Sequence, residues 1–201
     1  DPRYPAERID HILADSGAKL CLTVRNSPVA PPGTPAIAVD HPELLEQLRT
    51  TPDNPVRSHD RVGPLTLDNP AYLIYTSGTT GVPKGVVVSH HGLVDFTSEQ
   101  VQRFGVETDS VTLHFASPSF DASVLEVLMA VGGAATMVIA PPHVLGGNEL
   151  QDVLADQSVT HAFVTPSVLA TMESDALPAL STVIVGGGNM GCGLLYHLAE
   201  E

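Results

Sequence analysis

The chain has 201 residues, and its 9 Lys and Arg against 23 Asp and Glu give a formal charge of −14. Because 43% of the residues are hydrophobic, the chain can bury a core, which argues against disorder, and the length suits one domain or one large piece of a bigger one. Nucleic-acid binding needs clustered Lys and Arg, and this acidic sequence shows no such cluster, so we expect no nucleic-acid partner.

Membrane and metal sites are also disfavoured. The longest weakly polar run, residues 127–142, is too short and too rich in Gly and Pro for a span of roughly 20 apolar residues. The opening DPRYPAERID has no basic and then apolar leader, and its lack of an initiator Met fits a fragment. Cys21 and Cys192 lie far apart and form no CxxC pair, which is typical of a reducing compartment. We therefore expect a cytoplasmic protein with no membrane partner and no metal ligands.

The first seventy residues predict short elements joined by Pro-rich connections. Ile9, Ile12 and Leu13 follow helical spacing, and Gly17 is a natural helix end. In chain order we expect a helix over residues 5–16, a strand over 19–24, a connection over 26–35, a strand over 36–39, a helix over 42–49 and an exposed loop over 50–64.

From Ala71 onward, strands and helices alternate. The expected strands are 71–75, 85–89, 112–115, 135–139, 161–165 and 182–185; the expected helices are 92–104, 123–130, 149–157, 167–172 and one at the end of the chain. This alternation predicts an α/β fold, with helices on the faces of a mixed but largely parallel sheet.

Between the first two of these strands lies a loop rich in glycine and hydroxyl groups, YTSGTTGVPKG. Hydroxyls and backbone amides are neutral donors that can surround a polyphosphate, while Lys84 supplies one positive charge and Pro83 stiffens the loop. Lys84 precedes a glycine and a strand, unlike the lysine of the common nucleotide-binding loop. The residues alone leave two hypotheses open: a phosphate-binding loop, or a flexible hairpin turn without a ligand. The candidate phosphate-binding residues are Thr76, Ser77, Gly78, Thr79, Thr80, Gly81, Pro83, Lys84 and Gly85.

A second candidate site lies at Phe120-Asp121-Ala122-Ser123, where an apolar helix is expected to begin. Asp121 can cap that helix or place a negative charge in its first turn. Its carboxylate can instead bind an ammonium group at the mouth of an apolar pocket, where a charge-assisted bond is strong. From the residues alone, helix capping is the favoured interpretation.

A resemblance to a known family changes that balance. The segment AYLIYTSGTTGVPKGVVVSH resembles the signature loop of the adenylate-forming, AMP-binding superfamily. Residues 1–23 and the segment FDASVLEVLMAVGGAA resemble parts of the adenylation domains of nonribosomal peptide synthetases, in the family's order. The resemblance covers roughly residues 1–180. It implies part of that family's large amino-terminal domain, with mostly parallel sheets flanked by helices, over residues 1–182.

The resemblance also implies a function: ATP-dependent activation of an amino acid, with Mg²⁺, followed by transfer to the phosphopantetheine arm of a carrier protein. The loop would hold the β- and γ-phosphates, with Lys84 as its catalytic residue, and Asp121 would bind the substrate's α-amino group. The side-chain pocket would be lined by Ala122, Leu125, Phe163 and Ile184, all apolar, which predicts an aliphatic amino acid. The family's downstream segments have no counterpart here, so we expect the chain alone to be inactive.

The last residues depart from this pattern. Residues 183–201 contain GGGNMG, in which Gly186, Gly188 and Gly191 satisfy the GxGxxG spacing between a strand and a helical pattern. This stretch resembles the FAD-binding amino terminus of flavoproteins of the sarcosine or dimethylglycine dehydrogenase type. It predicts the start of a dinucleotide-binding unit. The alternatives to a ligase fragment are therefore a fusion with an FAD-dependent amine oxidoreductase and a catalytically incomplete remnant.

Overall fold

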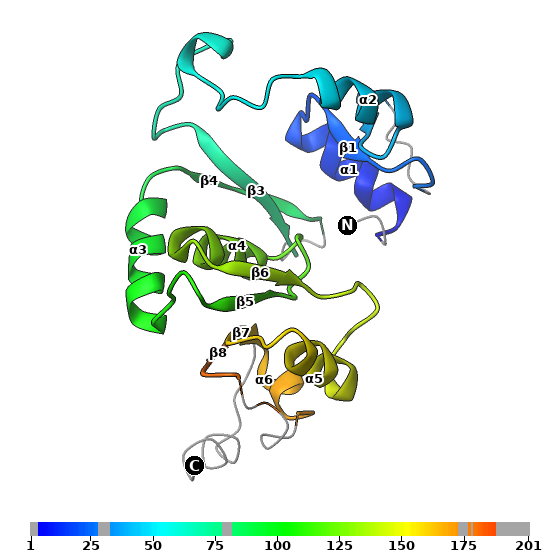
Figure 1. Ribbon diagram of the computed structural model, residues 1–201. Coiled ribbons are helices and arrows are strands. Elements are labelled where there is room, and N and C mark those ends of the chain that lie inside the picture. The colour runs from blue at the N-terminus through cyan, green and yellow to red at the C-terminus, as the bar shows by residue number, and fades with distance from the viewer. Residues whose placement is uncertain (1–3, 28–32, 78–81, 173–176, 178, 188–201) are drawn as a thin grey trace. The chain divides into compact units, whose positions relative to one another are not determined.

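The computed structural model describes residues 4–27, 33–77, 82–172, 177 and 179–187 (Figure 1). The chain divides into two units, Asp1–His91 and Gly92–Glu201. This division falls elsewhere than the expected boundary after residue 182. That boundary lies inside strand β8 (Thr182–Val185), which pairs with β7 (His161–Val164).

The first unit holds two small sheets and two helices. Its elements are α1 (Ala6–Ser16), β1 (Cys21–Thr23), β2 (Ala36–Ala38), α2 (Pro42–Thr50), the short 3₁₀ helix η1 (Ser58–Asp60), β3 (Pro70–Thr76) and β4 (Lys84–Ser89). Strands β1 and β2 are parallel, whereas β3 and β4 form an antiparallel hairpin. Helix α1 ends, as predicted, where Gly17 adopts a left-handed conformation with φ of 61°.

None of the described residues of this unit is fully buried. Two-stranded sheets have too little area to enclose a core, so apolar side chains such as Leu22 and Val87 stay 67% and 60% exposed. The expected exposed loop at residues 50–64 is confirmed, apart from the short turn of η1.

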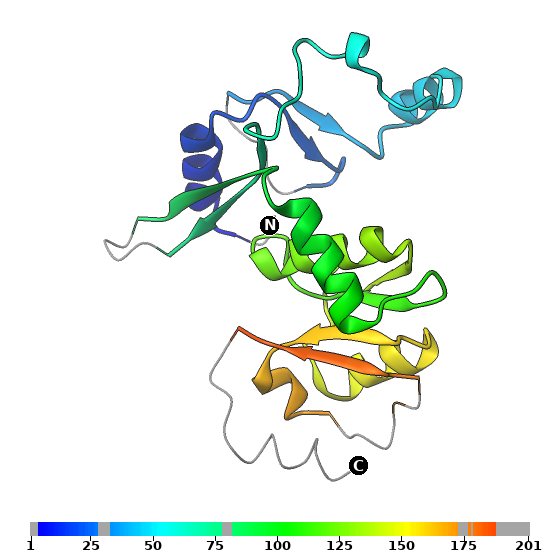
Figure 2. The same cartoon turned by 90° about the vertical axis from the view of Figure 1, so that its left-hand side faces the viewer.

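The second unit contains the core. Its elements are α3 (Leu93–Phe104), β5 (Val111–His114), α4 (Asp121–Gly133), β6 (Thr136–Ile139), α5 (Gly147–Asp156), β7, α6 (Pro166–Leu169) and β8. The four strands form one parallel sheet in the order β6-β5-β7-β8, and Figure 2 shows β7 and β8 running side by side. The predicted α/β fold with largely parallel strands is therefore confirmed.

The core of this unit lies between the sheet and α5. Leu113 of β5, Leu150 and Leu154 of α5, and Val164 of β7 are at most 1% exposed. Helix α3 packs closely on α4, because a Cβ atom at Gly132 would lie only 2.3 Å from Cγ2 of Thr97. This packing fixes α4, which begins with the candidate residue Asp121, against the rest of the unit.

Candidate functional site

Strands β3 and β4 place the two ends of the predicted phosphate loop opposite each other. In their antiparallel register Thr76 pairs with Lys84, and Tyr75 pairs with Gly85. The expected hairpin is therefore present, and it brings the lysine beside the first hydroxyl of the loop. The predicted residues Gly78, Thr79, Thr80 and Gly81 lie outside the described residues.

The described part of the loop offers unengaged donors. The side chains of Thr76, Ser77 and Lys84 are exposed, and none of them makes a hydrogen bond or ion pair with another described residue. Two hydroxyls and one ammonium beside a glycine-rich turn fit an anionic ligand such as a polyphosphate. Pro83 is half-buried directly before Lys84.

Helix α1 supports the base of this loop. The Tyr75 hydroxyl donates a hydrogen bond to Asp15 Oδ2 at 2.6 Å, and its ring meets the His11 ring edge-on with centroids 6.2 Å apart. His11 Nε2 also lies 3.5 Å from the carbonyl oxygen of Pro83. A Cβ atom at Gly85 would lie 3.2 Å from Tyr75 Cζ, so glycine leaves room for this ring. Burial, together with the Asp15 carboxylate, raises the pKa of Tyr75 to about 12.

We therefore expect Tyr75→Phe to lower the free energy of unfolding by about 0.5–1.5 kcal/mol, because the Asp15 carboxylate loses its donor. Tyr72→Phe is the matched control: it lies on the same strand, and its hydroxyl makes no hydrogen bond within the described ranges. Urea denaturation of both variants measures the difference. If both variants lower the free energy of unfolding equally, the Tyr75–Asp15 hydrogen bond does not stabilise the base of the loop.

The second candidate site begins at the first residue of α4. Phe120 occupies the N-cap position and makes no side-chain capping bond, so the prediction that Asp121 caps the helix is wrong. Asp121 instead lies in the first turn, where the helix dipole favours a negative charge. Its carboxylate is exposed and has no hydrogen-bond or ion-pair partner among the residues that the structure describes. A free carboxylate in this position can bind an ammonium group.

The remaining pocket candidates form two groups. Asp121, Ala122 and Leu125 are spaced so that they share one side of α4. Phe163 of β7 and Ile184 of β8 are Cα partners in the parallel register, so their side chains point to the same face of the sheet. The structure thus makes the last two residues neighbours, although they are 21 positions apart in the sequence.

The glycine-rich stretch after β8 has a packing role at its first residue. A Cβ atom at Gly186 would lie 3.2 Å from Cε2 and Cζ of Phe163, so the phenyl ring covers this glycine. Gly187 adopts φ of 79°, which few other residues tolerate. Gly188 and Gly191 lie outside the described residues, so dinucleotide binding here stays a prediction.

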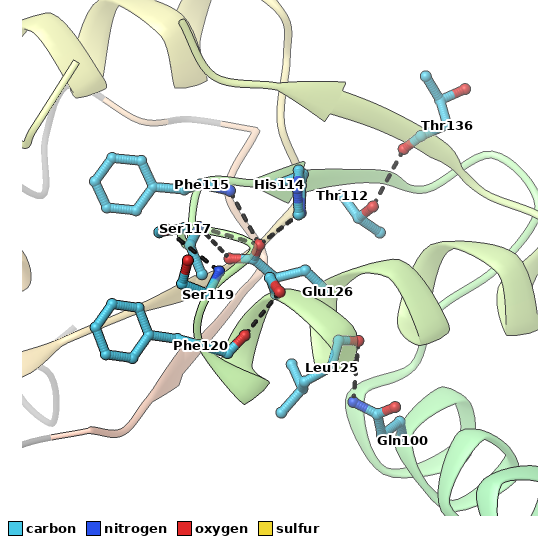
Figure 3. Close-up of polar contacts among 12 residues, drawn as sticks. Gln100, Thr112, His114, Phe115, Ser117, Ser119, Phe120, Leu125, Glu126 and Thr136 are labelled. Atoms are coloured by element: carbon cyan, nitrogen blue, oxygen red, sulfur yellow. Dashed lines mark hydrogen bonds and ion pairs between the residues drawn. The ribbon is translucent and has the colours of Figure 1, made fainter. Parts of the chain in front are cut away.

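One site residue, Glu126, was missed by the sequence analysis. It belongs to the buried face of α4, which consists of Ser123, Glu126, Met129, Ala130 and Gly133. Its carboxylate is fully buried and accepts hydrogen bonds from the amides of Phe115 and Ala116, each at 3.1 Å (Figure 3). The sequence does mark Glu126 as unusual, because it is the only Asp, Glu, Lys or Arg between Asp121 and Glu149.

His114 lies beside the same carboxylate. Its Nδ1 is 2.8 Å from Glu126 Oε2 without the angles of a hydrogen bond, so the two groups form an ion pair only when His114 is protonated and Glu126 is ionised. Burial raises the pKa of Glu126 to about 7, against the opposing effect of the hydrogen bonds from the Ala116 and Phe115 amides. Burial also lowers the pKa of His114. Both shifts follow from the cost of burying a charge.

The pKa of Glu126 predicts a pH-dependent stability. The folded protein keeps the Glu126 proton up to about pH 7, whereas an unperturbed carboxyl releases it near 4.5. Between these values the folded state binds more protons, so the free energy of unfolding should fall as pH rises from about 4.5 to about 7.

Denaturation of Glu126→Gln across this range isolates that contribution. His114 favours folding as pH rises, but it is present in both proteins, so the wild type should lose stability relative to the variant. The exposed Glu149→Gln should follow the wild type. A constant difference between wild type and Glu126→Gln would show that the buried carboxyl does not titrate in this range.

The described ranges hold neither a membrane-spanning helix nor a metal-binding cluster. No helix there is long and apolar enough to cross a membrane. No group of three or more His, Cys, Asp or Glu side chains is placed to hold a metal ion in the same ranges.

Comparison with known proteins identifies the family. The family model described as AMP-binding enzyme matches residues 1–200. CymA of Salinispora arenicola, a probable nonribosomal peptide synthetase, is 43% identical over 191 residues, which cover 93% of this chain and 2% of CymA. Novobiocin biosynthesis protein H of Streptomyces niveus is 38% identical over 202 residues, which cover 99% of this chain and 34% of that protein. The chain therefore spans about a third or less of the length of these relatives.

Solved structures agree with the sequence comparison. The AMPPNP-bound form of the nonribosomal peptide synthetase FmoA3 has a TM-score of 0.80 at 27% identity, over 96% of this chain and 20% of that chain. The N-terminal subdomain of Klebsiella oxytoca NpsA shares the fold, with a TM-score of 0.76 at 24% identity, over 96% of this chain and 47% of that chain. With a family match over nearly all of its residues, the chain belongs to the AMP-binding enzyme family and corresponds to part of an adenylation domain of the adenylate-forming superfamily.

Proposed function

We propose that this chain is the part of an amino-acid-activating ligase that binds the phosphates of ATP and the ammonium group of an amino acid, in nonribosomal peptide synthesis. The observation that carries the proposal is the hairpin register, which sets Lys84 opposite Thr76 at the base of a glycine-rich loop. The side-chain donors of Thr76, Ser77 and Lys84, which have no bonding partner among the described residues, fit a polyphosphate. The similarity to FmoA3, a peptide synthetase solved with AMPPNP, supports ATP as the nucleotide.

In the proposed reaction, an oxygen of the substrate carboxylate attacks the α-phosphorus of ATP. The bond to pyrophosphate breaks, and an aminoacyl-AMP remains. The thiol of a carrier protein's phosphopantetheine arm then attacks the acyl carbon, and AMP leaves. Positioning and charge neutralisation supply most of the catalysis in such phosphate chemistry. Thr76 to Gly85 would hold the β- and γ-phosphates, Lys84 would offset their charge, and bound Mg²⁺ would neutralise phosphate oxygens.

The proposed substrate is an aliphatic amino acid such as valine, leucine or isoleucine. The exposed Asp121 carboxylate would bind its ammonium group. Ala122, Leu125, Phe163 and Ile184 would line its side-chain pocket, and these residues offer no charge to a charged substrate. One methylene changes binding by only about 1–3 kcal/mol, so the three candidates lie within a small energy range.

The glycine-rich end supports the same assignment. The family match extends to residue 200, and β8 pairs in parallel with β7 along all four of its residues, at the edge of the described sheet. The close packing of Gly186 under the Phe163 ring explains the first glycine without a flavin. We therefore assign β8 to the adenylating fold. We also propose a cytoplasmic location, which the two distant cysteines support.

Amino-acid-dependent exchange of pyrophosphate into ATP tests this function. In the intact protein that contains this chain, we expect the largest exchange with valine, leucine or isoleucine. The 201-residue chain alone should show none, because it spans so little of its curated relatives. Exchange with no amino acid in the intact protein would overturn the proposal, and preference for a charged amino acid would overturn the pocket assignment.

Two variants separate the two binding roles. Lys84→Ala should raise the KM for ATP and leave the KM for the amino acid unchanged, whereas Asp121→Asn should do the reverse. Each lost charge-assisted bond predicts an increase of about tenfold or more. Lys19→Ala, which changes the chain's other lysine, and Asp152→Asn, which changes an exposed aspartate of α5, are the matched controls. Unchanged KM values in either site variant would contradict that residue's role.

A further inference from the structure

We infer that Glu126 is a positioning residue for the amino-acid site, because its buried carboxylate holds the start of the segment that leads directly to Asp121. This inference rests on the proposed function and adds a residue to it. The segment is defined here as residues 115–120, which connect β5 to α4.

The first end of the segment depends on Glu126. Pairing of β5 with β6 ends at His114 and Ile139, so the next two amides lie beyond the strand ladder. These amides, of Phe115 and Ala116, donate to the Glu126 carboxylate at 3.1 Å. A buried amide without an acceptor is costly, so the carboxylate determines where the chain leaves the sheet.

The second end of the segment is held by the same helix. The Ser123 hydroxyl donates to the carbonyl of Phe120 at 2.7 Å, and the Phe120 amide donates to the carbonyl of Ser117 at 2.9 Å. Figure 3 shows the Glu126 side chain between the end of β5 and the start of α4, with labelled residues of the segment beside it. Both ends of the segment are therefore bonded to side chains on the buried face of α4, while Asp121 stays exposed at the start of that helix.

An apolar residue would fill this position without performing the same role. Replacing both partners of a buried polar contact by apolar groups is often neutral, but the partners of Glu126 are backbone amides, which a substitution at this position cannot remove. A leucine would leave the Phe115 and Ala116 amides without acceptors. Glutamine offers one carbonyl oxygen, whereas above its pKa of about 7 the Glu126 carboxylate meets the Ala116 amide with both oxygens and the Phe115 amide with one. The two amides are thus satisfied by two acceptor oxygens on one side chain, which glutamine does not provide.

The experiment compares Glu126→Gln with the wild type in the intact protein, by amino-acid-dependent pyrophosphate exchange. We expect the KM for the amino acid to rise roughly tenfold, with the KM for ATP unchanged, because the loss of an acceptor shifts the segment before Asp121. Hydrogen exchange at the Phe115 and Ala116 amides should accelerate in the same variant. Ser123→Ala removes the hydroxyl bond to the Phe120 carbonyl but keeps the bond from the Ser123 amide, so it should raise the amino-acid KM by a smaller factor. This variant tests the inference if Glu126→Gln does not fold.

Leu154→Ala distinguishes positioning from a general loss of stability. Leu154 is 1% exposed in the core of the same unit and takes no part in the hydrogen bonds that hold the segment, so the variant should unfold more easily but keep both KM values. An amino-acid KM that rises equally in Leu154→Ala overturns the inference, as does an unchanged amino-acid KM in Glu126→Gln when the wild type is active. A wild type that exchanges with no amino acid overturns the proposed function itself.

Discussion

Parallel strand pairing is the constraint on which the second unit depends. Strand β5 pairs in parallel with β6 and β7, and β7 pairs in parallel with β8, so the carboxyl ends of all four strands meet at one edge of the sheet. Ligands of open α/β folds bind at that edge, where the chain leaves each strand. The segment before Asp121 follows β5, and Gly186 follows β8. Sheet topology therefore places the start of the proposed amino-acid site and the glycine that packs under Phe163 at the same edge.

Hydrogen bonding, rather than apolar burial, shapes both candidate sites. In the first unit, which has no fully buried residue among those described, the Tyr75 hydroxyl ties the loop base to Asp15 of α1. In the second unit, the buried Glu126 supplies acceptors to two amides that have left the sheet. A hydrogen bond fixes direction as well as distance, and that is what a site for charged ligand groups requires.

Much of the local structure could be predicted because local patterns determine it. The helical spacing of Ile9, Ile12 and Leu13, and Gly17 after them, correctly indicated α1 and its end. The β-branched run before Ser89 indicated β4, and the glycine-rich loop between two strands indicated the hairpin. Helix capping, the role that the residues alone favoured for Asp121, was wrong, because the helix begins at Asp121, two residues before the expected start at Ser123, and Phe120 becomes the N-cap; helix starts are weakly encoded.

By itself the sequence determined the α/β class, the order of the elements, the loop that ends at Gly85 and the family. Each of these depends on residues that are close together in the chain. Only the tertiary structure decided that Phe163 lies beside Ile184 and over Gly186, that Tyr75 bonds Asp15, and that Glu126 receives the amides after β5. The physical reason is that these contacts join residues 10 to 60 positions apart. They exist only once sheet order and helix packing have brought distant segments within hydrogen-bonding or van der Waals distance.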